Sequence, residues 1–183
     1  PPRSTLFPYT TLFRSLKPYQ KFFGRYITFF IIGQLQTLLI VLGNLFYLQI
    51  QCIHPFMMWF ACSVTSTVFT FFMYSLTVAF GNIGEALAIV FMVVQVAGSG
   101  GTFPIEVLPK VYQMIYKYLP FPYAMDAVRE TVAGMYGNYY WKCLGILCIY
   151  IVISLVIGLV LRIPFEKMNE MIEESKEKSG VML

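Results

Sequence analysis

The feature this sequence most lacks is charge. Only 12% of its 183 residues are Asp, Glu, Lys or Arg, about half the share found in an average soluble domain. Charged residues are absent from three stretches, which run from 26 to 84, from 86 to 105 and from 143 to 161. A membrane-spanning helix needs about 20 such residues, so the first stretch holds two spans and each of the others holds one. The composition therefore excludes a soluble protein and predicts an all-α integral membrane protein with four transmembrane helices.

The sequence also lacks the motifs of catalysis and cofactor binding. It contains no HExxH, no GxSxG, no Walker lysine motif and no pair of carboxylates inside a span. We interpret His54, the only histidine, as a hydrogen-bonded surface residue rather than a metal ligand. We therefore expect no catalytic residue, no cofactor and no metal site, and expect that the chain itself is not an enzyme. The net charge of +4 is spread over both ends and one loop, which argues against nucleic acid as a partner.

The four cysteines show neither CxxC nor zinc-site spacing; they are Cys52, Cys62, Cys143 and Cys148. Cys62 and Cys148 are expected to be small apolar packing residues. Cys52 and Cys143 both fall near the expected outer boundary of the membrane, so the sequence leaves open either a disulfide between them or two free thiols.

Residues 1–15, PPRSTLFPYTTLFRS, differ from the rest of the chain. They are rich in Pro, Ser and Thr and have no helical period. They resemble a translated sequencing-adapter read-through, so we expect a non-native scar that contributes nothing to the fold. A genuine disordered leader is the alternative. On the first interpretation the native part starts near Leu16 and is a truncated piece of a longer protein.

The transmembrane domain is expected over 16–163, with spans near 26–50, 56–80, 86–103 and 143–161. The first span contains Gln34, Gln36 and Asn44. Such side chains are costly against lipid, so they should face the interior of the bundle and bond between helices; a contact with substrate is the alternative. The polar remainder, 164–183, is predicted to be a cytoplasmic tail.

A long break interrupts the apolar pattern between 98 and 129. Glycines open it and prolines punctuate it, and these residues permit close backbone approach and stop helices, respectively. The pattern around Pro120 predicts two short extracellular interfacial helices, near 110–119 and 123–135, that lie on the membrane surface. Their apolar faces are expected to comprise Val111, Met114, Ile115, Tyr118 and Leu119 in the first helix, and Met125, Val128, Val132 and Met135 in the second.

Residues of this break are the structural or gating candidates of the chain: Gly98, Gly100, Gly101, Pro104, Pro109, Pro120, Pro122, Tyr123, Asp126 and Arg129. Asp126 and Arg129 are three positions apart, which allows an ion pair across one helical turn. We expect the pair and the glycines to position the outer helices without doing chemistry.

The distribution of basic residues predicts the orientation in the membrane. Seven lie near the ends of the transmembrane domain, at Lys17, Lys21, Arg25, Arg162, Lys167, Lys176 and Lys178. Four lie in the long loop, at Lys110, Lys117, Arg129 and Lys142. Because basic residues favour the cytoplasmic side and an even number of spans puts both ends on one side, both termini are expected to be cytoplasmic.

Two segments together carry a resemblance to a known family. They are GSGGTFPIEVLP at 98–109 and YLPFPYAMDAVRETVAGMYGNYYWK at 118–142. They resemble the C-terminal membrane domain of the YhgE/Pip family, also called phage infection proteins, and the resemblance covers about 19–164. That family is similar to the membrane domains of type-2 ABC exporters. The resemblance implies a bacterial plasma-membrane protein whose four spans are helices three to six of a six-helix bundle.

Two functions follow from this resemblance. The first is a membrane-spanning component of a YhgE/Pip-type, ABC-exporter-like transport system, which would sit in the lipid bilayer as a homodimer or hetero-oligomer and use a separate ATPase subunit. The alternative is a cell-surface membrane anchor or phage-infection receptor without transport activity. A gene for an ATP-binding cassette protein beside the full-length gene would favour the first.

Overall fold

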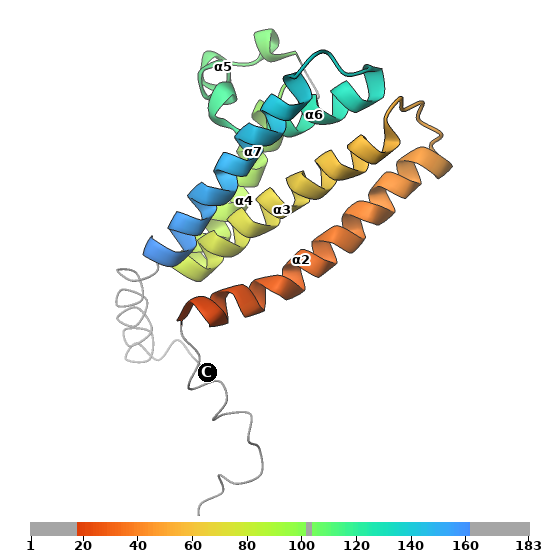
Figure 1. Cartoon of the computed structure of the whole chain (residues 1–183). Helices are drawn as coiled ribbons and strands as arrows, with labels where there is room; N and C mark the ends of the chain where they lie inside the picture. The colour runs from red at the N-terminus through yellow and green to blue at the C-terminus, as the bar shows by residue number, and fades with distance from the viewer. Residues whose placement is uncertain (1–17, 102–103, 162–183) are drawn as a thin grey trace, which may run out of the picture.

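The computed structural model describes residues 18–101 and 104–161, and this part of the chain is helical throughout apart from its connections (Figure 1). The helices in chain order are α2 (Pro18–Leu42), the π-helix η1 (Gly43–Tyr47), α3 (Pro55–Phe80), α4 (Asn82–Gly98), η2 (Ile105–Val107), α5 (Lys110–Ile115), η3 (Tyr116–Tyr118), α6 (Pro120–Ala133), α7 (Tyr139–Val156) and the π-helix η4 (Ile157–Leu161). The prediction of an all-α membrane protein is confirmed. The expected scar at 1–15 and the expected tail at 164–183 lie outside the described residues.

Helix α3 is the centre of the bundle. It contacts α2, α4, α6, α7 and η4, and Figure 1 shows it running between α2 and α7, with α5 and α6 gathered at one end. The main apolar core lies where α3, α6 and α7 meet. Its most deeply buried members include Ala61, Ala127, Tyr140 and Leu147, each 0% exposed. The bundle is therefore organised around α3.

Three helices in the described residues are long and apolar enough to cross a membrane: Phe22–Tyr47, Pro55–Phe80 and Tyr139–Leu159. They match the first, second and fourth predicted spans within a few residues. The third predicted span, 86–103, corresponds to α4, which begins at Asn82, ends at Gly98 and is a shorter apolar helix of 17 residues. Gly98 ends it because the chain then turns into the glycine segment. That α4 crosses the whole membrane stays a prediction.

The turn between α3 and α4 is very tight. Gly81 has a positive φ of 58°, a conformation that glycine adopts without steric cost. A Cβ on Gly84 would overlap the backbone carbonyl of Leu76. The two glycines therefore allow α4 to fold back directly against the end of α3.

Helices α2 and α3 are joined by hydrogen bonds between polar side chains. The Gln34 amide donates to Thr67 Oγ1 at 3.0 Å and to the Ser63 carbonyl at 3.3 Å, while Ser63 Oγ donates to Gln34 Oε1. Gln34 therefore faces the bundle as predicted. The other two predicted polar residues are less enclosed, since Gln36 is exposed and Asn44 is half-buried in η1.

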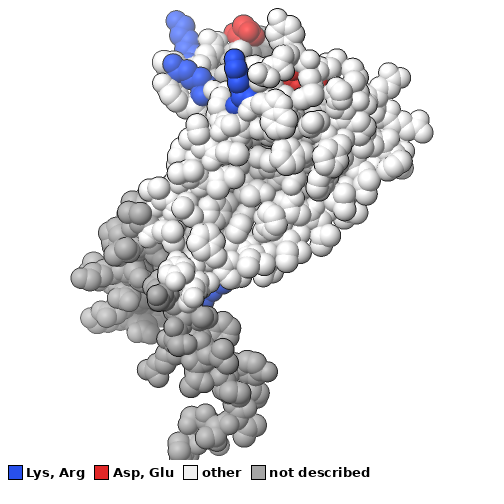
Figure 2. All heavy atoms as spheres, viewed as in Figure 1, with Lys and Arg blue, Asp and Glu red and all other residues white. Residues whose placement is uncertain are grey.

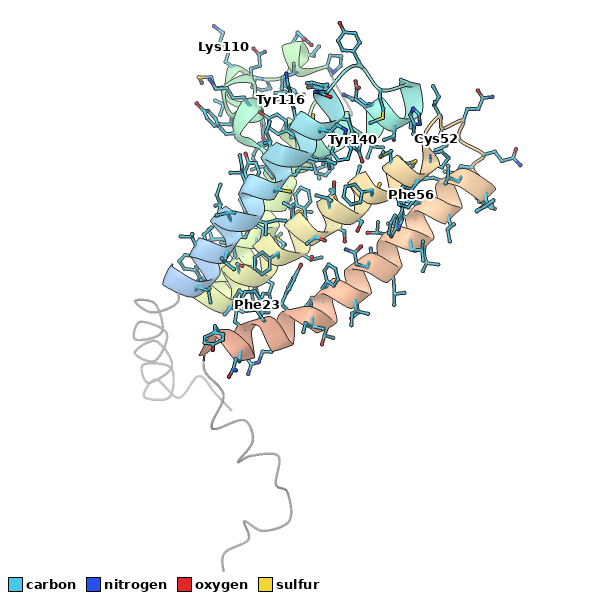
Figure 3. The ribbon with its side chains drawn as sticks, in the orientation of Figure 1. Phe23, Cys52, Phe56, Lys110, Tyr116 and Tyr140 are labelled. Carbon is cyan, nitrogen blue, oxygen red and sulfur yellow. The ribbon has the colours of Figure 1, made fainter. Side chains whose placement is uncertain are left out.

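The loop between α2 and α3 is tied to the end of α6. The Thr131 carbonyl accepts from the His54 backbone amide at 3.1 Å and from Cys52 Sγ at 3.3 Å. Figure 3 shows Cys52 beside the start of α3, and Tyr140 further into the bundle. All four cysteines are free thiols, so of the two states that the sequence left open for Cys52 and Cys143, the structure has the free thiols.

Charged side chains lie at the ends of the described bundle. Figure 2 shows most of the basic and acidic groups at the end formed by α5 and α6 and a basic group at the opposite end, while the sides of the bundle in that view are uncharged. Lys110 and Lys117 are both exposed there. Such a separation of charged ends from apolar sides is what a bilayer requires of the protein inside it.

Candidate functional site

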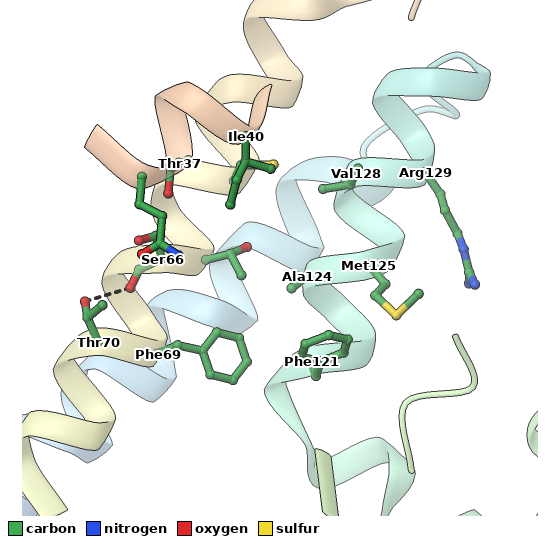
Figure 4. A pocket seen from close by; sticks show the side chains of 13 residues that line it. Thr37, Ile40, Ser66, Phe69, Thr70, Phe121, Ala124, Met125, Val128 and Arg129 are labelled. Atoms are coloured by element: carbon green, nitrogen blue, oxygen red, sulfur yellow. Dashed lines mark hydrogen bonds between the residues drawn. The ribbon is translucent and has the colours of Figure 1, made fainter. Parts of the chain in front are cut away.

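Two neighbouring cavities lie along one face of α3. The first, of about 490 Å³, lies between α2, α3 and α6 and is lined by Gln36, Thr37, Ile40, Cys62, Thr65, Ser66, Phe69, Thr70, Phe121, Ala124, Met125, Val128 and Arg129 (Figure 4). The second, of about 480 Å³, lies between α2, α3 and α4 and is lined by Phe29, Phe69, Thr70, Met73, Tyr74, Thr77, Glu85 and Met92. Because Phe69 and Thr70 line both, the cavities adjoin. We call the pair the α3 groove.

The floor of the α3 groove carries hydroxyl groups whose hydrogens are already engaged. Thr65 Oγ1 donates to the Ala61 carbonyl at 2.8 Å, and Thr70 Oγ1 donates to the Ser66 carbonyl at 2.7 Å. Ser66 Oγ donates across to the Gly33 carbonyl of α2 at 3.2 Å. A hydroxyl that donates in this way keeps its oxygen lone pairs, so the floor offers acceptors to a bound molecule.

The walls of the α3 groove are apolar and aromatic. Phe121 and Met125 of α6 and Phe69 of α3 line the first cavity (Figure 4), and the rings of Phe69 and Phe121 stand edge to face with their centroids 5.8 Å apart. Phe29 and Met92 line the second cavity from α2 and α4. A groove of this size with few polar groups is typical of a site for an apolar or amphipathic molecule.

The two ends of the α3 groove carry opposite charges. Arg129 lines the first cavity, and its side chain is 54% exposed. Glu85, in the first turn of α4, lines the second cavity. Cys62 and Thr77 mark the extent of the groove along α3, about 22 Å apart at 1.5 Å per residue. The groove is therefore elongated along α3, with Arg129 near the end formed by α5 and α6.

The predicted ion pair of α6 is present. Arg129 Nη1 lies 3.2 Å from Asp126 Oδ1, and Asp126 Oδ2 accepts from the Tyr139 hydroxyl at 3.0 Å. The neighbouring carboxylate of Glu130 accepts the Tyr136 backbone amide at 2.6 Å. The bond from Tyr139 connects α6 to the start of α7, and the bond from Tyr136 connects α6 to the loop before α7.

The glycine candidates lie where three helices approach one another. A Cβ on Gly98 would stand 3.0 Å from the Tyr112 ring, and one on Gly101 would stand 2.6 Å from Met125 Cε. Gly100 has a positive φ of 68°, which favours glycine. The segment therefore brings α4 close to α5 and α6, as the sequence pattern suggested, although the role of these glycines in gating stays a prediction.

The proline candidates mark helix starts. Pro104 and Pro109 directly precede η2 and α5, and Pro120 is the first residue of α6, the position that proline favours. Pro122 is buried in the first turn of α6. The last candidate, Tyr123, donates its hydroxyl to the Lys117 carbonyl at 2.7 Å and so fastens α6 to η3.

The packed faces of the outer helices differ from those predicted. In α6 the buried residues are small or are prolines, namely Pro120, Pro122, Ala124, Ala127 and Thr131, whereas the predicted apolar face places Met125 and Val128 at the α3 groove. The first predicted outer helix, 110–119, corresponds to α5 and η3. Ile115 is half-buried and Leu119 is buried, as expected, but Val111, Met114 and Tyr118 are exposed. Small residues form the packed face of α6 because they let this helix approach α3 and α7 closely.

Burial raises the pKa of the Tyr116 hydroxyl, and the negative charge of Asp126 raises it further. Tyr116 lies in η3, beside the glycine segment, where its ring is 3.4 Å from the position of a Cβ on Gly100. Its hydroxyl is therefore neutral at physiological pH.

Sequence reasoning missed the α3 groove and one buried amide. Gln95 of α4 is 0% exposed, and its side-chain nitrogen and oxygen have no hydrogen-bond partner within the described residues. The signal was available, because Gln95 is an amide inside an apolar helix, as Gln34 is. The hydroxyl residues of α3 are visible in the sequence, but their position beside a cavity depends on α2 and α6.

Comparison with known proteins finds a matching family and several similar sequences. Residues 10–160 match the family described as "ABC-2 family transporter protein". Over 160 residues, 87% of this chain, the sequence is 29% identical to the "Uncharacterized protein YhgE" of Bacillus subtilis (strain 168), and covers 20% of that protein. Over 63 residues, 34% of this chain, it is 35% identical to "Nodulation protein J" of Rhizobium leguminosarum bv. viciae, and covers 24% of that protein.

The chain thus spans about a fifth to a quarter of the length of these relatives. No solved structure matches it significantly. The family match extends over every described helix except the last residue of η4. The chain belongs to the ABC-2 transporter family and is a membrane component of an ABC-2-like system.

Proposed function

We propose that this chain is part of the transmembrane pathway of an exporter and that a separate ATP-binding subunit supplies the energy. The observation that carries the proposal is the family match, which runs from before α2 into η4. The sequence has no Walker lysine motif, so ATP hydrolysis by that route would belong to a partner. The chain itself is then not an enzyme, and it works as a homodimer or hetero-oligomer.

The arrangement of helices supports a role in transport. Helix α3 contacts α2, α4, α6 and α7, and one of its faces borders the α3 groove. The groove is lined from α2, α4 and α6, so relative movement of these helices would change its width. The hydroxyl groups on the floor of this otherwise apolar groove support the proposal, because polar side chains that face the interior of a membrane bundle often mark a transport path.

The proposal includes an orientation, with both termini cytoplasmic and α5 and α6 outside. Lys110, Lys117 and Arg129 are exposed at the outer end; the greater number of basic residues near the two ends supports placing those ends inside. In this orientation α5 and α6 lie where a lid over the exit would be, and their movement would gate release.

Purification of the full-length protein under mild conditions tests the transport role. We expect an ATP-binding cassette protein to copurify, and ATP hydrolysis by that protein to change when the membrane component is removed. If no ATPase copurifies and cells that lack the protein show no export defect, the proposal is wrong and the anchor or receptor function is favoured.

The orientation has its own test, which does not depend on transport. In a variant without the four native cysteines, a single cysteine replaces Lys117 or Lys176. An impermeant thiol reagent added to intact cells should label the first variant and leave the second unlabelled. The reverse result would invert the topology and remove the lid.

A further inference from the structure

We propose that the α3 groove binds the acyl chain of an anionic phospholipid taken from the surrounding bilayer, with the phosphate held by Arg129. The proposal concerns binding alone and stands whether or not the chain takes part in export. It follows from the shape of the groove, the chemistry of its walls and the position of its single cation.

The shape fits one extended hydrocarbon chain. The two cavities adjoin at Phe69 and Thr70 and follow α3 from Cys62 to Thr77, a distance of about 22 Å. A wide, round cavity would suit a compact solute, whereas a slot parallel to a membrane-spanning helix lies parallel to the lipid chains around it. A lipid can therefore enter from the side without turning.

The walls fit hydrocarbon rather than a polar polymer. Phe29, Ile40, Phe69 and Phe121 present apolar surface to the groove from α2, α3 and α6. The floor hydroxyls have already donated their hydrogens to helix carbonyls, so an alkyl chain that lies over them leaves no hydroxyl hydrogen unsatisfied. Burial of an alkyl chain here costs little in lost hydrogen bonds.

The charge at one end fits a phosphate. Among the described residues that line the first cavity, Arg129 is the charged one, and its ion pair with Asp126 uses Nη1. A guanidinium has five N–H donors in a planar fork that matches phosphate, so donors remain after that pairing. The repulsion of the phosphate by the nearby carboxylates is weakened by their hydrogen bonds. Asp126 accepts from the Tyr139 hydroxyl, and Glu130 accepts from the Tyr136 amide.

Binding of phosphatidylglycerol and phosphatidylcholine to the delipidated full chain in nonionic detergent, followed by native mass spectrometry, tests the proposal. We expect one phosphatidylglycerol to bind about tenfold more tightly than phosphatidylcholine, the factor for one charge-assisted interaction. Arg129→Gln should bring the affinity for phosphatidylglycerol down to that for phosphatidylcholine, and Arg129→Lys should retain part of the difference. Thr65→Trp, which fills the first cavity, should weaken binding of both lipids.

Two matched variants serve as controls. Lys117→Gln removes an exposed cation from the same end of the molecule, and Val93→Trp adds the same bulk to the outer face of α4, where Val93 is 63% exposed. Both should bind phosphatidylglycerol as the unaltered chain does. Equal affinity for the two lipids, or unchanged binding in both Arg129→Gln and Thr65→Trp, would overturn the proposal.

A second readout needs no substitution inside the groove. Cys62 lines the first cavity, so in a Cys52→Ser, Cys148→Ser background it reports on occupancy through its reaction with a maleimide. Phosphatidylglycerol should slow this reaction several-fold more than phosphatidylcholine does. If Cys62 instead forms cross-links between two copies of the chain, a second copy occupies the groove and the lipid proposal fails.

Discussion

The two sides of α3 are held to their neighbours in different ways. Towards α2 the contact combines side-chain hydrogen bonds with an aromatic cluster: Gln34 is at the centre of the bonds, Tyr26 is bonded to Thr67 and Thr70 further along, and Phe22 packs against Phe71 and Tyr74. Towards α6 and α7 it consists of close packing, with Ala61 and Ala127 fully buried. We refer to these as the bonded side and the packed side.

The difference indicates which helices move together. In a membrane there is little hydrophobic gain from bringing helices together, so packing and hydrogen bonds must hold them. A packed contact between small residues has one good fit, whereas hydroxyls repeated along a helix offer alternative partners at successive turns. We therefore expect α3, α6 and α7 to behave as a rigid unit and α2 to shift against it.

The largest expected effect comes from overfilling the packed side. Ala127→Leu should lower the unfolding free energy in detergent by about 1–3 kcal/mol, because extra methylenes in a filled core force neighbouring groups apart. Ala133→Leu is the matched control, since it adds the same atoms to an exposed position of the same helix. Equal losses in the two variants would show that the packed side is not closely fitted.

A smaller effect is expected on the bonded side. Gln34→Leu should lower the unfolding free energy by about 0.6 kcal/mol and at most about 1.7, the range measured for hydrogen bonds between membrane helices. Gln36→Leu, at an exposed position of α2, should change stability less. A loss larger than that caused by Ala127→Leu would reverse the comparison and make the α2 contact the more rigid one.

The smallest effect is expected at the ion pair on the rim of the packed side. Arg129→Ala should change the unfolding free energy by no more than about 0.2–0.5 kcal/mol, because the pair is exposed and water screens it. The same thermal or chemical unfolding measurement in detergent checks this. A loss comparable to that of Ala127→Leu would mean that Arg129 belongs to the packed side.

The helices and several contacts could be predicted from the sequence. Gaps in charge marked the membrane-crossing parts of α2, α3 and α7, because a spanning helix excludes charge from the part that lies in the hydrocarbon layer. The cost of an unbonded amide in lipid predicted that Gln34 faces inward, and the spacing of Asp126 and Arg129 predicted their pair.

The α3 groove and the packed face of α6 could not be predicted in this way. Apolar periodicity singles out large side chains such as Met125. Every face of a helix in a membrane bundle is apolar, however, so the period does not distinguish a face that contacts lipid from one that packs against another helix. Ala124 and Ala127 pack because two other helices approach them closely. The groove exists only where α2, α4 and α6 leave α3 uncovered, and that depends on the tertiary arrangement.

The tight turn between α3 and α4 has a consequence for synthesis of the protein. Helix α4 has 17 residues, fewer than the roughly 20 that the insertion machinery favours in a single span, whereas α3 has 26 residues and no charge. Since Gly81 and Gly84 fold the two together without a loop, α4 is expected to enter the membrane only as the second arm of a hairpin that α3 leads. In glycosylation mapping with microsomes, a fusion that contains α4 alone should remain outside the bilayer, and one that contains both helices should insert. Gly84→Leu should separate the two helices of the hairpin, so that α4 no longer inserts with α3.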